Sequence, residues 1–420
     1  MPALLGPLRA RAFAAVWAGQ TLSSLGDRAY AAVLPFVVLE RGGGAGSLSA
    51  VLTAFSVAQI MALLAAGVVV DRNSRGLVMV VADLVRAAAV GSVAVLLLTE
   101  DLTVVGVAAA AVVLGLASAF FLPAYTAAIP ELVERDVLPA ANSLRGVSMQ
   151  VAGIGGPLLA GVLVAWGGTA LAAGIDAASF VAAALLLLLG GRSLLTTRRD
   201  AHGHGAGDSS APGRLGGWWN SIRAGLVAVT GQTWLWVSLA LFGVLNICFA
   251  GGVSLVLPLL AASRWQGARG YAFLLTALAA GSLVGAAAVG ARRWRHSTRA
   301  IYLFMAAAGV GLAGAAESES LPVAAGCIAV TGACIAGFAV LWETLLQQRV
   351  PPHLLGRVAS LDHLASVGLL PVGWAAVGLL VVVTSPARAL LDLGILVSVL
   401  ALAALSIPSV RNVETPASSS

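Results

Sequence analysis

Residues 48–70 and 77–99 are two apolar runs that flank a short charged loop. They read LSAVLTAFSVAQIMALLAAGVVV and LVMVVADLVRAAAVGSVAVLLLT, and the loop 71–76 between them is DRNSRG. A helix of about 20 apolar residues crosses the hydrocarbon core of a bilayer. Neither run alternates as a barrel strand would, and lipid offers no partner for unpaired backbone groups. The stretch therefore predicts two membrane-spanning helices joined by a tight loop.

The composition extends this prediction to the whole chain. Of 420 residues, 59% are apolar and only 10% are charged, against about 45–50% and about 25% in soluble domains. A water-soluble enzyme is therefore excluded. The roughly 248 apolar side chains would supply about twelve crossings of about 20 residues each.

Apolar runs bounded by charge, Gly or Pro recur along the chain. The predicted spans are 12–39, 48–70, 77–99, 102–128, 139–166 and 169–190, then 234–261, 270–291, 299–316, 321–345, 357–383 and 387–407. The first run has no cleavage site of a signal peptide. We expect an all-helical integral membrane fold with two six-helix bundles, residues 1–190 and 234–411. A linker with an interfacial helix would occupy 191–233, where Gly, Ser and Pro abound, and a disordered tail 412–420.

The basic residues predict the orientation in the membrane. All 24 are Arg. If the N-terminus is internal, eighteen lie at internal loops or ends and four lie outside: Arg41, Arg264, Arg269 and Arg388. This asymmetry places both termini in the cytoplasm, with the chain in the plasma membrane. It also accounts for the basic pI without nucleic acid. The absence of Lys excludes a Walker A loop and a pyridoxal Schiff base.

The two halves also repeat. A shift of 218 residues places Gly67 on Gly285 and Arg75 on Arg293, while Val289 replaces Asp71. Internal repeats of this kind are typical of transporters whose two halves surround a central path.

The loop Gly67-Val-Val-Val-Asp71-Arg72-Asn-Ser-Arg75 resembles the signature loop of the major facilitator superfamily, G-x-x-x-D-R-x-x-R. Further stretches narrow the resemblance to the branch that contains enterobactin exporters and macrolide efflux permeases. They are VADLVRA around Asp83, IPELV around Glu131, LPAANSL around Asn142, GGPLLAG from Gly155, IDAASF around Asp176, LLQQRVP around Gln347 and LGRV around Gly356. The resemblance implies the major facilitator fold and transport by alternating access.

The resemblance further implies that the loop cluster latches the outward-facing state. An Asp at a helix N-terminus gains about 0.3–1 kcal/mol from the helix dipole, and Arg can bridge two bundles. The alternative is that these Arg are ordinary positive-inside anchors. Asp83 and Arg86, three residues apart, share one helix face and can pair within the membrane, as a structural support of the latch or also as a proton relay. The latch residues are Gly67, Asp71, Arg72, Arg75, Asp83 and Arg86.

Asp27 is the acid that we expect to couple transport to protons. It lies about 16 residues into its run, or roughly 24 Å along a helix. A carboxyl group at that depth, exchanging a proton for cargo, is what a proton-coupled exporter needs. The alternative is a static ion pair, but the adjacent Arg28 faces another direction.

The fifth run carries a Gly/Pro element that resembles the antiporter signature of exporters. It consists of Gly155, Gly156, Pro157 and Gly161, with three residues instead of two between the last two. The fourth run lacks the Arg that many drug antiporters of related branches carry, which shifts the coupling role to Asp27.

The resemblance implies a substrate cavity lined by the first, fourth, seventh and tenth helices. Its candidate residues are Gln20, Tyr30, Phe120, Phe121, Tyr125, Asn246, Phe249, Trp342 and Glu343. Aromatic side chains with few charges suit a bulky amphipathic or weakly cationic molecule such as a drug, macrolide or siderophore. We expect a monomeric proton-coupled exporter without cofactor or metal. The alternatives are a non-transporting receptor or scaffold, and an uptake transporter. An enzyme is disfavoured, since the chain has no G-x-S-x-G, H-E-x-x-H or Cys/His cluster.

Overall fold

The computed structural model describes residues 5–191, 194–195, 229–292, 294, 297–351, 354, 358, 361–362, 364–366 and 368–411. These residues form helices and connecting turns, and no strand occurs among them. Most of the predicted linker, the predicted tail and the repeat position Arg293 lie outside the described residues.

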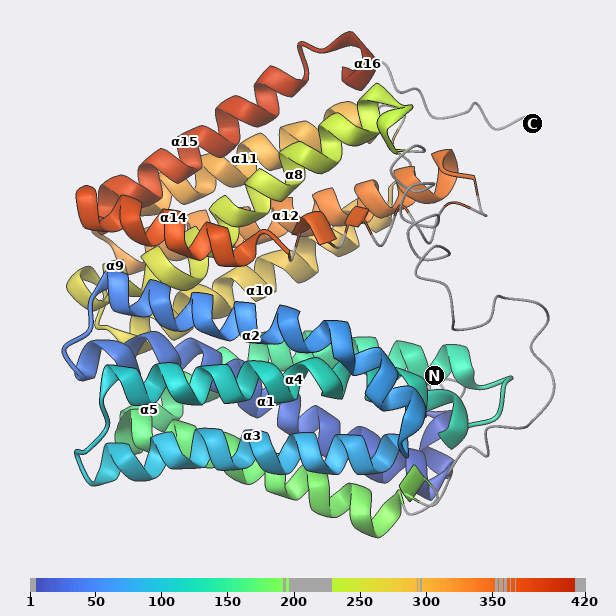
Figure 1. Cartoon of the computed structure of the whole chain (residues 1–420). Helices are drawn as coiled ribbons and strands as arrows, with labels where there is room; N and C mark the ends of the chain where they lie inside the picture. Colours follow the sequence, from blue (N-terminus) through green and yellow to red (C-terminus); the bar gives the residue numbers. More distant parts are fainter. Residues whose placement is uncertain are drawn as a thin grey trace. The chain divides into compact units, whose positions relative to one another are not determined.

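The helices follow the predicted apolar runs (Figure 1). The first half contains α1 (Arg11–Glu40), α2 (Ala45–Arg72), α3 (Arg75–Leu98), α4 (Val104–Leu132) and α5 (Leu138–Gly190), preceded by a short 3-10 helix (Gly6–Arg9). The second half contains α8 (Thr233–Gly251), α9 (Leu257–Arg264), α10 (Ala268–Gly290), α11 (Ser297–Glu317), α12 (Leu321–Arg349), α14 (Leu370–Val383), α15 (Pro386–Ala404) and α16 (Pro408–Arg411).

The long helix α5 consists of two membrane crossings. Its 53 residues contain non-helical backbone at Gly167 and Gly168, and Gly168 has a φ of +71°, which favours glycine. Contacts with α1 show that the two parts run in opposite directions. In the first part of α5, Ser148 approaches Thr21 and Gly156 approaches Arg28, so this part advances in the same direction as α1. In the second part, residues further along α5 approach residues earlier in α1, so this part runs in the opposite direction. The predicted boundary between spans 139–166 and 169–190 is therefore confirmed.

Eleven helices among the described residues are long and apolar enough to cross a membrane. Because α5 makes two crossings, they account for the twelve predicted spans. Many large apolar side chains remain exposed on them, among them Met61, Leu98 and Val105. Such surfaces are unfavourable in water and suit contact with lipid.

The seventh span is interrupted by a π-helix. Residues Gly252–Val256 take this conformation between α8 and α9. Short π-helical turns inside α-helices occur frequently at functional sites. The sequence predicted one uninterrupted run, 234–261, because a π turn leaves the apolar composition unchanged.

The chain forms two compact units. The first contains the N-terminal helices together with Pro258–Thr276, and the second contains the rest of the C-terminal half. Segment 258–276, which the sequence assigned to the C-terminal bundle, therefore packs with the first unit. Its Tyr271 ring lies 5.9 Å from that of Phe36 on α1.

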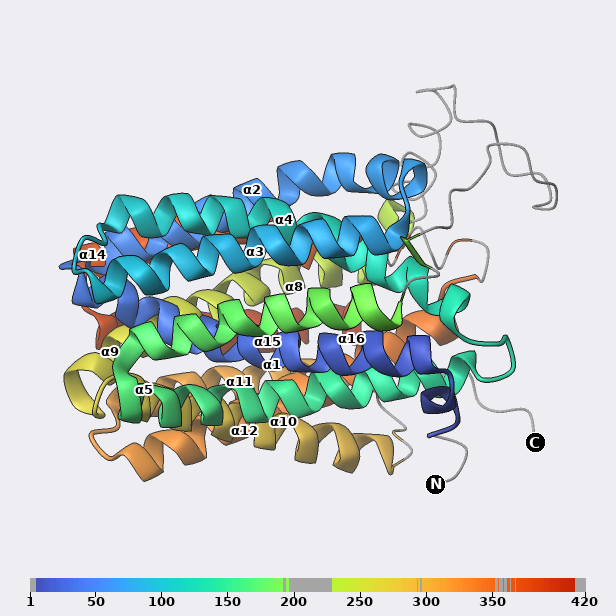
Figure 2. The ribbon, with the colours of Figure 1, turned by 90° about the horizontal axis from the view of Figure 1, so that it is seen from below.

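Glycines allow the helices of each unit to approach closely. In the first unit, α1 lies alongside α5 (Figures 1 and 2). A Cβ added at Gly19 would lie 3.1 Å from Cα of Ala183, and one at Gly156 would overlap Cβ of Arg28. In the second unit, Gly281 and Gly285 of α10 meet backbone carbonyls of α12. Without a hydrophobic driving force in lipid, such small-residue contacts hold membrane helices together.

This packing makes a stability prediction for two glycines of α5. Gly156→Ala should lower the thermal unfolding midpoint of the detergent-purified protein, because overpacking costs about 1–3 kcal/mol. Gly153→Ala is the matched control, since nothing lies within 4 Å of an added Cβ there. The control should stabilise by about 0.5–1 kcal/mol through helix propensity. Equal midpoints for the two variants would contradict the close α1–α5 contact at Gly156.

Candidate functional site

A cluster of charged side chains lies inside the first unit, with Arg86 of α3 at its centre. The Arg86 side chain is 4% exposed. Its Nη2 donates to Oδ1 of Asp83 in the same helix, and its Nη1 lies 3.5 Å from Oδ2 of Asp27 on α1. Nε2 of Gln20 donates to Oδ2 of Asp83 at 3.5 Å. The predicted Asp83–Arg86 pair is thus present, and Asp27 joins it.

Two aromatic rings flank the guanidinium of Arg86. Its central carbon lies 4.2 Å from the ring centroid of Phe121 on α4 and 4.4 Å from that of Phe180 on α5. Attraction between a cation and a ring face reaches about 2 kcal/mol when water is excluded. The rings therefore help to hold the charge within the bundle, and Arg86 contacts side chains from four different spans.

Asp176, on the second part of α5, is a further acid of this cluster. It is 0% exposed. Its Oδ1 lies 3.4 Å from Oγ of Ser179, while its Oδ2 is buried without a hydrogen-bond partner among the described residues. The sequence marked Asp176 as an acid within a span but gave it no role. The sequence signal for Asp176 was an acidic residue within an apolar span. Only the packing of the helices shows that Asp176 lies beside the other charged residues of the cluster.

Asp27 differs from the other two acids because its side chain is 41% exposed within the structure. The neighbouring Arg28 is also exposed. Both lie near the middle of α1, Arg11–Glu40, at a depth where lipid would strongly disfavour a charge. Intramembrane charges usually face the bundle interior or a water-filled space. This face of α1 is therefore the expected lining of an aqueous path.

Arg75, at the end of the signature loop, binds partners on α4. Nη1 of Arg75 lies 2.6 Å from Oε1 of Glu131 and donates to the backbone oxygen of Ala127. Asp71 and Arg72 are exposed. From the sequence we expected this loop to bridge the two bundles. The sequence did not identify Glu131 as the partner of Arg75.

Glycines of the signature loop and of the α5 element have different surroundings. A Cβ at Gly76 would lie 2.9 Å from Cβ of Leu194, whereas nothing lies within 4 Å of one at Gly67. A Cβ at Gly155 would lie 3.0 Å from Leu25 of α1, and one at Gly161 would lie 3.4 Å from Ala272. Pro157 is buried in the same helix.

The candidate cavity residues of the first unit lie in different environments. Gln20 and Phe121 belong to the charged cluster, and Tyr30 is buried beside Phe180. Tyr125 is buried, with its ring 5.3 Å from the guanidinium of Arg145. The sequence could not separate cargo-facing aromatics from those that pack within a bundle.

Candidate residues of the second unit also lie in distinct surroundings. Trp342 is buried, with its ring 4.8 Å from that of Phe242, and donates to Oδ1 of Asp362 at 3.3 Å. Phe249 is buried, Nδ2 of Asn246 donates to the backbone oxygen of Ser366, and Glu343 is exposed.

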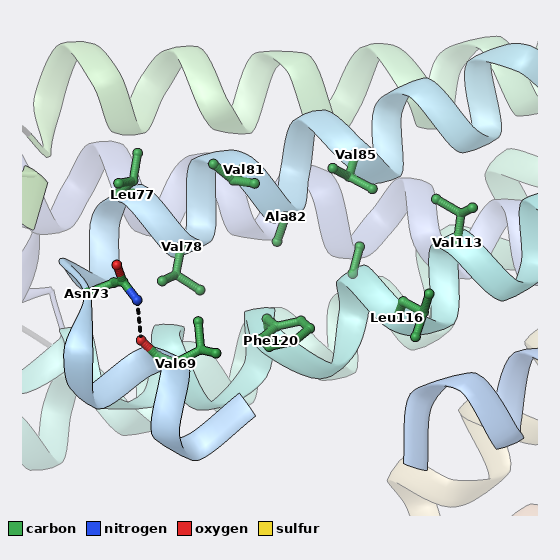
Figure 3. A pocket seen from close by; sticks show the side chains of 11 residues that line it. Val69, Asn73, Leu77, Val78, Val81, Ala82, Val85, Val113, Leu116 and Phe120 are labelled. Atoms are coloured by element: carbon green, nitrogen blue, oxygen red, sulfur yellow. Dashed lines mark hydrogen bonds between the residues drawn. The ribbon is translucent and has the colours of Figure 1, made fainter. Parts of the chain in front are cut away.

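Phe120 lines an apolar pocket of about 480 Å³ in the first unit, shown in Figure 3. Side chains of α3 and α4 form its walls, and Val69 at the C-terminal end of α2 and Asn73 just after it complete them. Nδ2 of Asn73 donates to the backbone oxygen of Val69 at 2.8 Å. The pocket is thus bounded at one end by the signature loop.

Comparison with known proteins agrees with this architecture. The chain is 27% identical to the multidrug efflux pump Tap of Mycolicibacterium fortuitum over 420 residues, which cover 97% of each chain. It is also 27% identical to the multidrug efflux pump Tap of Mycobacterium tuberculosis over 408 residues, covering 94% of this chain and 92% of that one.

Solved structures share the fold at low identity. A bacterial homologue of the iron transporter ferroportin, in an inward-facing state, matches with a TM-score of 0.70 and 18% identity, covering 94% of this chain and 98% of that one. A bacterial homologue of the human lysosomal transporter Spinster matches with a TM-score of 0.69 and 14% identity, covering 98% of this chain and 100% of that one. The sequence profile of the Major Facilitator Superfamily matches residues 16–369. With its twelve crossings and this match over most of its length, the chain belongs to the Major Facilitator Superfamily and is a membrane transporter.

Proposed function

We propose that the chain is a proton-coupled exporter that moves a bulky amphipathic molecule out of the cell. The observation that carries this proposal is the Asp27–Arg86 pair, with a half-exposed carboxylate near mid-membrane and a buried guanidinium 3.5 Å away. A proton bound by Asp27 removes its negative charge and weakens its attraction to Arg86. Proton binding at a water-facing carboxylate would therefore change contacts between α1 and α3.

This contact change provides a route from proton binding to transport. Asp27 lies next to Arg28, whose Cβ meets Gly156 of α5. Movement of α1 at Asp27 would therefore also displace α5, which carries the Gly/Pro element. Cargo and proton would alternate at this face of α1, each bound in the state that releases the other.

Export as the direction of transport is supported by the relatives, which bear the name multidrug efflux pump. The Gly/Pro element of α5, whose Gly156 packs against α1, fits the same direction. An amphipathic cargo agrees with the aromatic side chains on α4 and α8. The Arg distribution supports a location in the plasma membrane with both termini on the cytoplasmic side. We also propose that the protein acts as a monomer.

The signature loop would act as the latch of the transport cycle. Arg75 is tied to Glu131, so it fixes the start of α3 to the end of α4. Asp71 and Arg72 are exposed and free of ion pairs within the described first unit. They are therefore available to partners that change between states.

Transport by everted membrane vesicles tests proton coupling. Vesicles with an acidic lumen should accumulate a fluorescent cationic dye, a macrolide or a siderophore when they carry the wild type. Asp27→Asn should reduce this accumulation at least about tenfold, equivalent to about 1.4 kcal/mol. Asp392→Asn is the control, because Asp392 pairs with Arg388 at an exposed position.

Three outcomes of this assay would contradict parts of the proposal. Equal accumulation by the wild type and Asp27→Asn would exclude Asp27 as the coupling group. Loss of compound from preloaded vesicles would indicate uptake, and no movement of any compound by the wild type would favour the receptor or scaffold alternative.

A charge exchange tests the Arg75–Glu131 contact. Arg75→Glu would replace the guanidinium that lies 2.6 Å from Glu131 by a second carboxylate, and the repulsion should abolish accumulation. Adding Glu131→Arg restores an attractive pair and should recover most of the lost transport at equal protein level. A double variant as inactive as Arg75→Glu would contradict the claim that the cycle depends on the attraction between these two side chains.

A further inference from the structure

Asp176 is a buried acid for which the proton-coupled cycle above has no use. Its neighbours come from two other helices and its own. On α1 they are Asp27 and Tyr30, on α3 Arg86, and on its own helix Ser179. The titratable groups around it thus comprise one carboxyl group, one tyrosine and one guanidinium, and Asp83 joins the same cluster through Arg86.

Close helix packing places Asp176 beside Asp27. A Cβ added at Gly26 would lie 2.5 Å from Oδ1 of Asp176 and 2.5 Å from Oγ of Ser179. Gly26 is the residue immediately before Asp27. Phe180, one turn after Asp176 on α5, lies against Arg86. Asp176 therefore occupies the same layer of the bundle as Asp27 and Arg86.

The cluster contains more acids than bases. Asp27, Asp83 and Asp176 share one buried guanidinium, that of Arg86, while the exposed Arg28 acts on Asp27 from outside the cluster. Three ionised carboxylates would therefore leave an excess of two negative charges inside the bundle. Uncompensated charge costs several kcal/mol per ion away from water. Asp83 is held by Arg86 and Gln20, which leaves Asp27 and Asp176 as alternative partners for the remaining face of Arg86.

Two unused atoms point to such an exchange of partners. Nε of Arg86 and Oδ2 of Asp176 are both buried without a hydrogen-bond partner among the described residues. In the observed arrangement Arg86 is paired with Asp27, and Ser179 is the only hydrogen-bonding partner of the Asp176 carboxyl group in the described part of the chain. A buried carboxylate without a counter-ion carries a large energetic cost, and a bound proton removes this cost by neutralising the group.

We propose that Asp176 is a second proton-exchanging carboxyl group, which stores a proton while Arg86 pairs with Asp27. This inference rests on the proposed proton coupling. When the proton moves to Asp27, the O–H bond at Asp176 breaks and one forms at Asp27. Arg86 then turns from the neutral Asp27 to the new carboxylate at Asp176. The charge of the cluster is unchanged, and Asp27, the exposed member, exchanges the proton with water.

Infrared difference spectroscopy of the purified full-length protein in lipid tests this inference without any cargo. Protonated carboxyl groups give a separate C=O stretching band, which can be followed during a pH titration. Asp176→Asn should remove one such band, and Asp176→Glu should restore a shifted one. Asp392→Asn, at the exposed pair with Arg388, should leave the spectrum unchanged.

The state of this band in Asp27→Asn tests the exchange of partners. Because the side chain at position 27 is then permanently uncharged, Arg86 should turn to Asp176, so Asp176 should lose its proton and its band should be absent at a pH at which the wild type shows it. A spectrum of Asp176→Asn identical to the wild type would overturn the inference, as would an Asp176 band of unchanged size in Asp27→Asn.

These outcomes are separable from the fate of the proposed function. The bands report proton occupancy whether or not any compound is transported. Gradient-independent transport by vesicles, together with the expected bands, would remove proton coupling but leave Asp176 as a proton-exchanging group.

Discussion

The buried guanidinium of Arg86 is the constraint on which the first unit depends. A positive charge inside a membrane-spanning bundle requires counter-ions and the exclusion of lipid from its surroundings. Arg86 obtains them from Asp83 on its own helix, Asp27 on α1 and the rings of Phe121 and Phe180. Removing one partner of a fully buried pair such as Asp83–Arg86 typically costs about 3–5 kcal/mol. In the proposed cycle, protonation of Asp27 would act on the packing of these helices through the same guanidinium.

Helix α3 connects this cluster to the signature loop. Arg75 and Arg86 are eleven residues apart on α3, a distance of about 16 Å along the axis. Arg75 pairs with Glu131 at the end of α4, while Phe121 of the same α4 covers Arg86. A shift of α3 relative to α4 would therefore alter both sites together. The two groups that the sequence treated as one latch are joined by this helix pair rather than by direct contact.

Much of the fold follows from the sequence, because lipid imposes a strict length and composition on every span. The first run, 12–39, corresponds to α1, Arg11–Glu40, and the turn at Gly167–Gly168 falls between two predicted spans. The Asp83–Arg86 pair was also predictable, since residues three apart share a helix face.

The composition of the cluster was not predictable in the same way. Convergence of Asp27, Asp176 and Arg86 depends on Gly26 and Gly156, which allow α1 and α5 to approach. Which face of a helix meets which neighbour is not encoded in a periodicity, because nearly every face of these helices is apolar. The π-helix in the seventh span was not predicted because it depends on local backbone geometry. The Arg75–Glu131 pair was not predicted because it depends on a partner distant in sequence.

The central claim is that Asp27 exchanges protons with water and passes the resulting charge change to Arg86. Proteoliposomes adsorbed to a capacitive sensor and subjected to a pH jump report this charge movement directly, with no cargo required. The wild type and Asp392→Asn should both give a transient displacement current, which should vanish in Asp27→Asn. An undiminished transient in Asp27→Asn would contradict the account.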